Sequence, residues 1–188
     1  MLPRNTVQSY LSHHVLIAMP QLTDAYFAQS VVYLLRHDAD GAMGVIINKP
    51  VAMTLAQLFE SADIPHGDVS AEPELVFGGP VMRERGFVLH DTQAHWASTL
   101  NNEHWGVTTS KDILSAIAQA NGPAHYQICL GYAGWEAGQL EQELAENAWL
   151  VVPADTDLVF ATPPYERYQT ALDRLGIDVT QLGAGGHA

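Results

Sequence analysis

The chain has little cysteine, few basic residues and no long apolar run. Its 188 residues include one cysteine, Cys129, so an intramolecular disulfide cannot form. Lysine and arginine number 8 against 21 aspartate and glutamate residues, which gives a formal net charge of −13. Nowhere do about 18 apolar residues follow one another, and no basic region leads into an apolar stretch at the start. These absences predict a cytoplasmic protein with neither disulfides nor membrane spans.

The shortage of basic residues also bears on nucleic-acid binding. Lysine and arginine supply much of the affinity for DNA by displacing counterions from its phosphates. Here the basic residues are scattered, and only Arg83 and Arg85 are close neighbours. We therefore expect no direct contact with nucleic acid and no membrane partner, but an unknown protein or small-molecule partner.

The remaining composition is that of a folded domain. Hydrophobic residues make up 47% of the chain and charged residues 15%, which is typical of a globular protein. A chain of this length buries roughly 70% of the surface that it exposes when unfolded. Because no repeat or linker divides the sequence, we predict one domain over residues 1–188, with a disordered, glycine-rich tail at about 182–188.

Strand and helix signals alternate along the chain and predict an α/β (α+β) domain, in which helices flank a mixed sheet. The expected strands are 14–18, 30–35, 43–47, 75–77, 87–89, 105–109, 126–130, 149–152 and 158–160. The expected helices are 54–62, 110–121, 135–147 and 164–175.

Local signals define some of these elements more closely. The turn residues 38–41 are too few for a parallel crossover, so the strands on either side should form an antiparallel hairpin. The strands at 75–77 and 87–89 predict a second hairpin. Thr54 and Gln57 have the spacing of a capping box, and Ser110 is placed to cap the next helix.

The stretch 127–153 indicates where a binding site lies. Its apolar strand ends in Gly131-Tyr132-Ala133-Gly134-Trp135, which we interpret as a glycine turn leading into an acidic amphipathic helix. Gly138 inside that helix would cost about 1 kcal/mol relative to alanine, and Gln139 would lie one turn from Trp135. Either close backbone packing or a ligand contact would explain the glycine.

No catalytic or metal motif accompanies this stretch. Cys129 lies in a predicted interior strand, where a thiol usually acts as a small hydrophobe, and as a nucleophile it would need a partner such as His90. The nine histidines lack the paired spacings of zinc sites, and His90 with His95 is the closest approach. Gly78-Gly79-Pro80 lacks the Lys-Ser/Thr of a phosphate loop, which leaves a strained turn as the simpler interpretation. We expect no metal and no cofactor.

Four segments in order give the chain a resemblance to the YqgE/AlgH family over nearly its whole length. They are Leu16-Ile17-Ala18-Met19-Pro20 with Asp24 and Phe27, residues 41–50, Phe77-Gly78-Gly79-Pro80-Val81 with residues 86–90, and residues 131–135 with 138–141. The resemblance implies an α/β sandwich on a mixed, largely antiparallel sheet. It also implies a cytosolic protein labelled as a transcriptional regulator, without a defined biochemical activity.

Two hypotheses follow for the function. The first is a non-enzymatic binding module that regulates gene expression indirectly, because the motifs fall at strand ends and corners, where function often lies. Its predicted binding residues are Met19, Pro20, Asn48, Pro50, Gly78, Gly79, Pro80, His90, Gly131, Tyr132, Trp135 and Gln139. The alternative is an enzyme acting on a small metabolite with His90 as acid or base and Asn48 or Gln139 orienting the substrate. That alternative requires His90 to lie near Tyr132 and Trp135.

Overall fold

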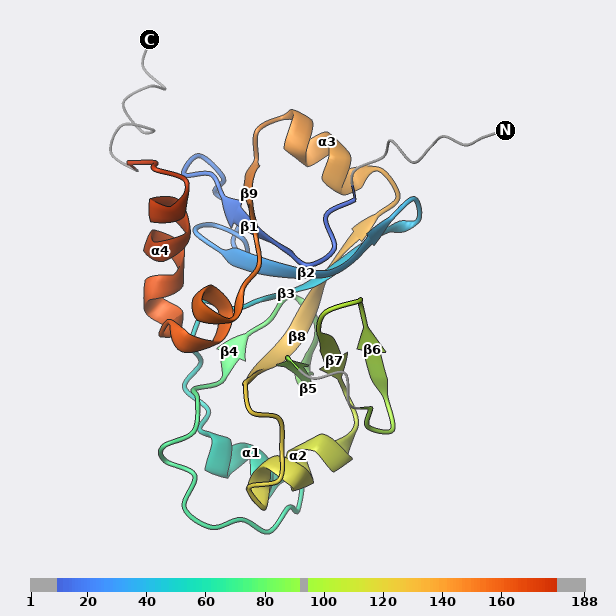
Figure 1. The fold of residues 1–188 in the computed structure, drawn as a ribbon, viewed down its shortest axis with the longest axis vertical. Helices are drawn as coiled ribbons and strands as arrows, with labels where there is room; N and C mark the ends of the chain where they lie inside the picture. Colours follow the sequence, from blue (N-terminus) through green and yellow to red (C-terminus); the bar gives the residue numbers. More distant parts are fainter. Residues whose placement is uncertain (1–9, 92–94, 179–188) are drawn as a thin grey trace.

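Strand β8 (Tyr126–Glu136) is the centre of the sheet (Figure 1) in the computed structural model, which describes residues 10–91 and 95–178. Its first half pairs antiparallel with β5 (Val81–His90) and parallel with β4 (Val76–Phe77). Its last residues pair antiparallel with β3 (Gly41–Ile46). One long strand therefore joins the two parts of the sheet. The tail expected at 182–188 lies outside the described residues.

The other strands extend the sheet on both sides of β8. They are β1 (His14–Ala18), β2 (Val31–Asp38), β6 (Thr99–Asn101), β7 (Gly106–Thr108) and β9 (Trp149–Pro153). Within the described residues the sheet has nine strands, in the order β6-β7-β5-β8-β3-β2-β1-β9, with β4 attached to β8. Because β4 and β8 run parallel and the other strand pairs are antiparallel, the expectation of a mixed, largely antiparallel sheet is confirmed.

Four α-helices in the described part cover different regions of the sheet (Figure 1). Helices α1 (Leu55–Ser61) and α2 (Lys111–Ala118) lie together at the bottom of the view, α3 (Gln139–Ala145) lies at the top, and α4 (Arg167–Arg174) lies at the left. Side chains alternate between the two faces of a strand. The buried residues of β1 and β2 accordingly divide between a core with α4 and a core with α3.

Two glycine segments cross at the middle of β8 with their backbones in contact. Gly131 has a φ of +82°, and a Cβ there would lie 2.3 Å from the carbonyl oxygen of Gly79. A Cβ on Gly78 would lie 2.3 Å from the carbonyl oxygen of Gly131. Any side chain would force the segments apart, which accounts for glycine at these positions by packing.

Several expectations from the sequence are confirmed. Strands β2 and β3 pair antiparallel through the short turn at residues 38–41. Helix α1 begins with the predicted capping box, in which the Gln57 backbone N–H donates to Thr54 Oγ1 (3.1 Å) and the Thr54 N–H donates to Gln57 Oε1 (2.9 Å). Both features depend on neighbouring residues, so local chemistry was enough to define them.

Other expectations are wrong. β4 and β5 do not form a hairpin, because β4 pairs parallel with β8 instead. The segment 131–135 is no turn, because β8 continues to Glu136, and the helix expected at 135 starts at Gln139. The strand expected at 158–160 is part of a π-helical segment (Asp157–Ala161).

Ser110 occupies the N-cap position of α2, as expected, but its side chain does not cap the helix. Its hydroxyl makes no capping bond to α2 but donates to the Asp112 carboxylate and accepts from the Ser98 N–H. Ser110 thus joins the start of α2 to the segment before β6.

Candidate functional site: a tryptophan pocket at the end of β8

Three aromatic rings surround a small hollow where β8 turns into α3. The rings belong to Phe27, Trp135 and Trp149, and their centroids lie 5.9–6.2 Å apart. The hollow has a volume of about 240 Å³, and we call it the tryptophan pocket. Its lining includes Asp24, Phe27, Trp135, Glu143, Glu146 and Trp149. The pocket lies where four elements meet, which are the loop that carries Phe27, strand β8, helix α3 and the edge strand β9.

One carboxylate fixes both indoles of the tryptophan pocket. The Nε1–H groups of Trp135 and Trp149 each donate to Glu143 Oε1, at 2.9 Å in both cases. The two tryptophans are almost fully buried and Glu143 is half-buried. Buried indole N–H groups need acceptors, so Glu143 satisfies both and holds the rings in a set orientation.

Gln139 and Gly138 place Glu143 opposite the indoles. The Gln139 amide donates to Glu143 Oε2 (3.0 Å), and its oxygen accepts from the Glu136 N–H (3.0 Å). Gly138 is the N-cap of α3 with a φ of +79°, where a side chain would be strained. The glycine therefore precedes the helix rather than interrupting it, and it lets the chain pass from strand to helix within a few residues.

The loop that carries Phe27 is organised by Asp24. Its Oδ1 accepts from the backbone N–H groups of Tyr26 (2.8 Å) and Phe27 (3.1 Å). Lys49 donates to the Tyr26 carbonyl oxygen (2.7 Å), and desolvation of its ammonium lowers the pKa of Lys49 although the Asp24 charge opposes this. These bonds place the Phe27 ring against both tryptophans.

Four of the predicted binding residues lie at or near the tryptophan pocket. Trp135 and Gln139 line it. Met19, which precedes Pro20, donates its N–H to the carbonyl oxygen of Ala148, the residue before Trp149. The Met19-Pro20 turn thus leads into the loop that carries Asp24 and Phe27.

Most of the other predicted binding residues take part in backbone contacts away from the tryptophan pocket. Asn48 Oδ1 accepts from the Val31 N–H (2.8 Å), and its amide donates to the Gln29 carbonyl oxygen (2.9 Å). Pro50 forms an isolated bridge with Val76. The remaining members of this group sit at or beside the glycine crossing described above, and they are Gly78, Gly79, Pro80, Gly131 and Tyr132.

The structure separates His90 from the pocket. His90 lies at the end of β5 opposite Tyr126, is fully buried, and its Nε2 lies 2.8 Å from Thr108 Oγ1. Tyr126 and Trp135 lie near opposite ends of β8, and at about 3.3 Å per residue the strand between them spans about 30 Å. The arrangement does not supply the proximity that the enzyme hypothesis needs.

The thiol of Cys129 lies in the core beside a buried arginine. Burial raises the pKa of Cys129 to about 12, although the charge of Arg167 opposes the shift. The Arg167 guanidinium donates to the carbonyl oxygens of Ile47 and Thr162 and to Gln127 Oε1. The sulfur thus remains a protonated thiol at neutral pH, which agrees with the structural role expected for it.

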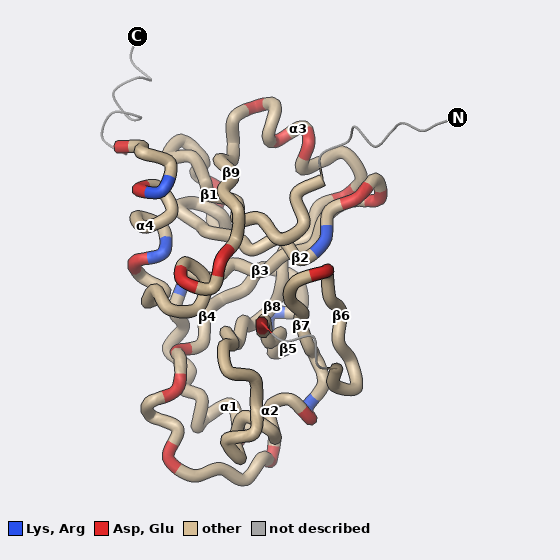
Figure 2. Tube along the Cα trace, viewed as in Figure 1, with Lys and Arg blue, Asp and Glu red and all other residues tan. Residues whose placement is uncertain are grey.

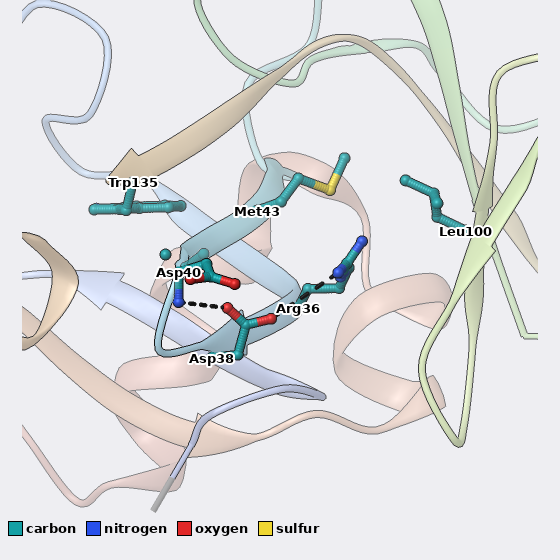
Figure 3. A pocket seen from close by; sticks show the side chains of 8 residues that line it. Arg36, Asp38, Asp40, Met43, Leu100 and Trp135 are labelled. Carbon is teal, nitrogen blue, oxygen red and sulfur yellow. Dashed lines mark hydrogen bonds and ion pairs between the residues drawn. The ribbon is translucent and has the colours of Figure 1, made fainter. Parts of the chain in front are cut away.

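A second hollow of nearly the same size lies beside Trp135 at the β2–β3 turn (Figure 3). We call it the hairpin pocket, and its volume is about 230 Å³. Met43 from β3 and Leu100 from β6 point toward one another across it, and Arg36 lies 3.9 Å from Asp38 at its rim. Among its described lining residues, Trp135 is the one aromatic, and Asp38 and Asp40 give it two carboxylates beside the single guanidinium of Arg36.

A larger hollow, of about 500 Å³, lies beside α1 between residues 51–56 and 67–75. Met53, Val69 and Leu75 form part of its wall, and the Tyr126 hydroxyl donates to Glu72 at its edge. Of the described residues that line it, none belongs to the predicted binding set and none is aromatic. In the described part of the chain, it therefore lacks the aromatic walls of the tryptophan pocket despite its size.

The surface around the tryptophan pocket is acidic. Figure 2 shows Asp and Glu but no Lys or Arg along α3, whose seven residues are all described. In residues 10–91 and 95–178, neither Glu143 nor Glu146 forms an ion pair with a basic side chain. The pocket thus combines aromatic walls with carboxylates whose charge is not neutralised by a direct partner.

Sequence reasoning missed half of this arrangement. Glu143 was one acidic residue among several on an amphipathic helix, and Trp149 was the first residue of a strand. One local signal was available, because Glu143 follows Gln139 by four residues and the two side chains therefore share a helix face. The meeting of both indoles on one carboxylate depends on β9 reaching β1, which local sequence does not encode.

Fold and pocket together define an α/β protein whose largely antiparallel sheet carries an aromatic pocket at the end of its central strand. Comparison with known proteins then identifies the group. The AlgH-like family model matches residues 15–180, and the chain belongs to that family. Among the described residues, no helix is long and apolar enough to cross a membrane, and no group of three or more histidine, cysteine or acidic side chains is arranged to hold a metal ion.

Relatives and solved structures agree with this assignment. A UPF0301 protein of Azoarcus sp. (strain BH72) is 48% identical over 98% of this chain and all of the relative, and one of Chromobacterium violaceum is 50% identical over 95% and 97%. The solution structure of the AlgH protein from Pseudomonas aeruginosa is 45% identical with a TM-score of 0.78, covering 98% of this chain and 97% of the other. A Corynebacterium diphtheriae protein shares the fold at 19% identity, with a TM-score of 0.72 and coverage of 96% and 94%.

Proposed function

We propose that the protein is a binding module that regulates gene expression indirectly, by holding a protein or small-molecule partner at the tryptophan pocket. The observation that carries the proposal is the pair of indoles fixed by Glu143, at 2.9 Å each. Rings that are already held lose little freedom when a partner arrives, which favours affinity. Buried tryptophans are also frequent anchors of binding energy.

The regulatory and cytoplasmic parts of the proposal have separate support. The resemblance to a family labelled as transcriptional regulators supplies the link to gene expression. The net charge of −13 favours an indirect route over contact with DNA phosphates. A single cysteine suits a reducing compartment, and we therefore propose that the protein acts in the cytoplasm.

Partner capture from native lysate tests the proposal. Immobilised wild type is compared with Trp135→Ala and, as a matched control, Trp105→Ala, because Trp105 is buried to the same degree but packs with Tyr33 and Phe160. Each variant is first checked by circular dichroism. A partner retained by wild type and Trp105→Ala but lost by Trp135→Ala supports the proposal, and equal capture by all three contradicts it.

A surface variant keeps the test decisive if the tryptophan variants unfold. Glu146 is exposed at the rim of the pocket, so Glu146→Arg should fold normally and still abolish capture. Retention of duplex DNA by the wild type at low salt would count against the indirect route.

A further inference from the structure

The size of the tryptophan pocket limits what can enter it. Its volume of about 240 Å³ is below the usual range of roughly 300–1,000 Å³ for pockets that hold drug-sized ligands and cofactors. A nucleotide would not fit, whereas the end of one side chain or a small organic group would. The occupant is therefore compact.

The orientation of the rings suits a group that stacks on aromatic faces. Trp149 stands at 74° to Trp135 and at 82° to Phe27, whereas Phe27 and Trp135 are tilted by 40°. Rings at steep angles present faces in more than one direction to the same hollow. Such arrangements attract cations, because the face of an aromatic ring is electron-rich and tryptophan attracts them most strongly.

The charge of the lining points in the same direction. Glu143 accepts from two indoles at Oε1 and from one amide at Oε2, all of them neutral donors, so its charge is not cancelled and Oε2 can accept from a further donor. Glu146 accepts from the Gln142 amide, which is also neutral. The basic side chain on the opposite loop, Lys49, is held by the Tyr26 carbonyl oxygen. An incoming cation would be the direct counter-charge of both glutamates.

We propose that the tryptophan pocket binds a guanidinium group, stacked on an indole face and paired with the carboxylates of Glu143 and Glu146; this inference rests on the binding function proposed above. A guanidinium is planar, stacks on aromatic rings and matches a carboxylate with two parallel N–H groups, whereas an ammonium is more strongly hydrated and does not stack. The group belongs either to a free alkylguanidine or to an arginine side chain of a protein partner.

Titration of ¹⁵N-labelled protein with n-butylguanidinium tests the proposal, with n-butylurea as its neutral isostere. We expect the indole N–H signals of Trp135 and Trp149 to shift, while those of Trp96 and Trp105, which do not line this pocket, stay in place. Equal shifts with n-butylurea, or tighter binding of n-butylammonium, would overturn the proposal. So would the absence of any shift at these two indoles.

Charge variants on one helix provide the matched control. Glu146→Gln and Glu143→Gln each remove a charge from the pocket and should weaken n-butylguanidinium binding about fivefold or more. Glu141→Gln removes the same charge from α3, but Glu141 does not line the pocket and faces His37 at 3.3 Å. Its affinity should change less than about twofold. Equal weakening by all three would show a long-range effect and contradict a specific site.

A second ligand distinguishes the two possible sources of the guanidinium group. Acetyl-Gly-Arg-Gly-amide should bind more tightly than n-butylguanidinium if a protein arginine is the natural occupant, and more weakly if a free alkylguanidine is. Either order supports the pocket assignment, provided that a control peptide with neutral citrulline in place of the arginine does not bind.

Failure of this inference is distinguishable from failure of the proposed function. If Glu146→Arg abolishes partner capture but n-butylguanidinium neither binds nor displaces the captured partner, the binding module stands and the guanidinium is wrong. If neither capture nor guanidinium binding depends on the pocket, both the proposed function and the guanidinium inference are wrong.

Discussion

The tryptophan pocket and the hairpin pocket are nearly equal in volume but opposite in construction. At about 240 and 230 Å³ they differ by little. The first has rings locked by a shared carboxylate whose charge has no direct counter-ion. The second shares Trp135 but otherwise has the aliphatic side chains of Met43 and Leu100, and Arg36 lies 3.9 Å from Asp38 at its rim. Preorganised walls and carboxylates without a direct counter-ion, rather than volume, distinguish the pocket that we propose as the binding site.

The largest expected difference between the two hollows is in stability. Trp149 is 5% exposed and packs against two aromatic rings, so Trp149→Ala should lower the free energy of unfolding by roughly 3–5 kcal/mol. Leu100 is 48% exposed, and Leu100→Ala should cost less than about 0.5 kcal/mol. Urea unfolding measures both. A comparable loss for the two variants would mean that Trp149 is not part of a packed wall.

Removing a carboxylate from each pocket should produce a smaller difference in the free energy of unfolding. Glu143→Ala leaves two buried indole N–H groups without an acceptor and should cost about 1–3 kcal/mol. Glu143→Gln keeps an acceptor oxygen and should cost less. Asp38→Ala breaks an exposed ion pair of 3.9 Å and the exposed bond that Asp38 Oδ1 accepts from the Asp40 N–H; the ion pair is worth about 0–1 kcal/mol and weakens with salt. Unfolding at low and high salt distinguishes these cases. A salt-sensitive loss at Glu143 would contradict its role as acceptor for the indoles.

Acid should destabilise the fold through His13, which lines neither of the two pockets. Burial, aided by the charges of His104 and His14, lowers the pKa of His13 from 6.5 to about 4. The Tyr33 hydroxyl lies 2.9 Å from His13 Nδ1 and receives the Asn102 amide, so it donates to a neutral imidazole. The His13 imidazole binds a proton more readily in the unfolded chain than in the folded protein. The stability that neutral His13 contributes is therefore complete above pH 6.5 and decreases as the pH falls toward 4.

The variant His13→Asn tests that pH dependence. Asparagine tolerates the left-handed backbone at this position, where φ is 61°. The free energy of unfolding should depend less on pH between 6.5 and 4 in the variant than in the wild type, while the indole signals of Trp135 and Trp149 stay unchanged. An unaltered pH dependence would assign the acid sensitivity to other groups.

What the sequence could predict follows from how local each feature is. The capping box at Thr54 and the β2–β3 hairpin depend on neighbouring residues, and both are confirmed. The start of α3 was misplaced because Gly131 and Gly134 suggested a turn, whereas Gly131 permits a backbone crossing inside a continuing strand. β4 was assigned to the wrong partner because its parallel pairing with β8 spans about fifty residues.

The candidate site could likewise be predicted only where its residues are close together in the sequence. Trp135 and Gln139 lie close together in the chain, within the stretch 127–153, and both line one pocket. Phe27 and Trp149 join them only because β1 pairs with β9 and brings distant loops together. The glycines of the predicted binding set have a packing role, which the sequence left open beside the functional one.

A crystal structure of the protein soaked with n-butylguanidinium tests the central claim most directly, because both hollows are present in the same molecule. The account predicts the planar cation in the tryptophan pocket, within about 6 Å of an indole centroid and paired with Glu143 or Glu146. A guanidinium bound at Asp38 in the hairpin pocket, with the tryptophan pocket empty, would contradict it.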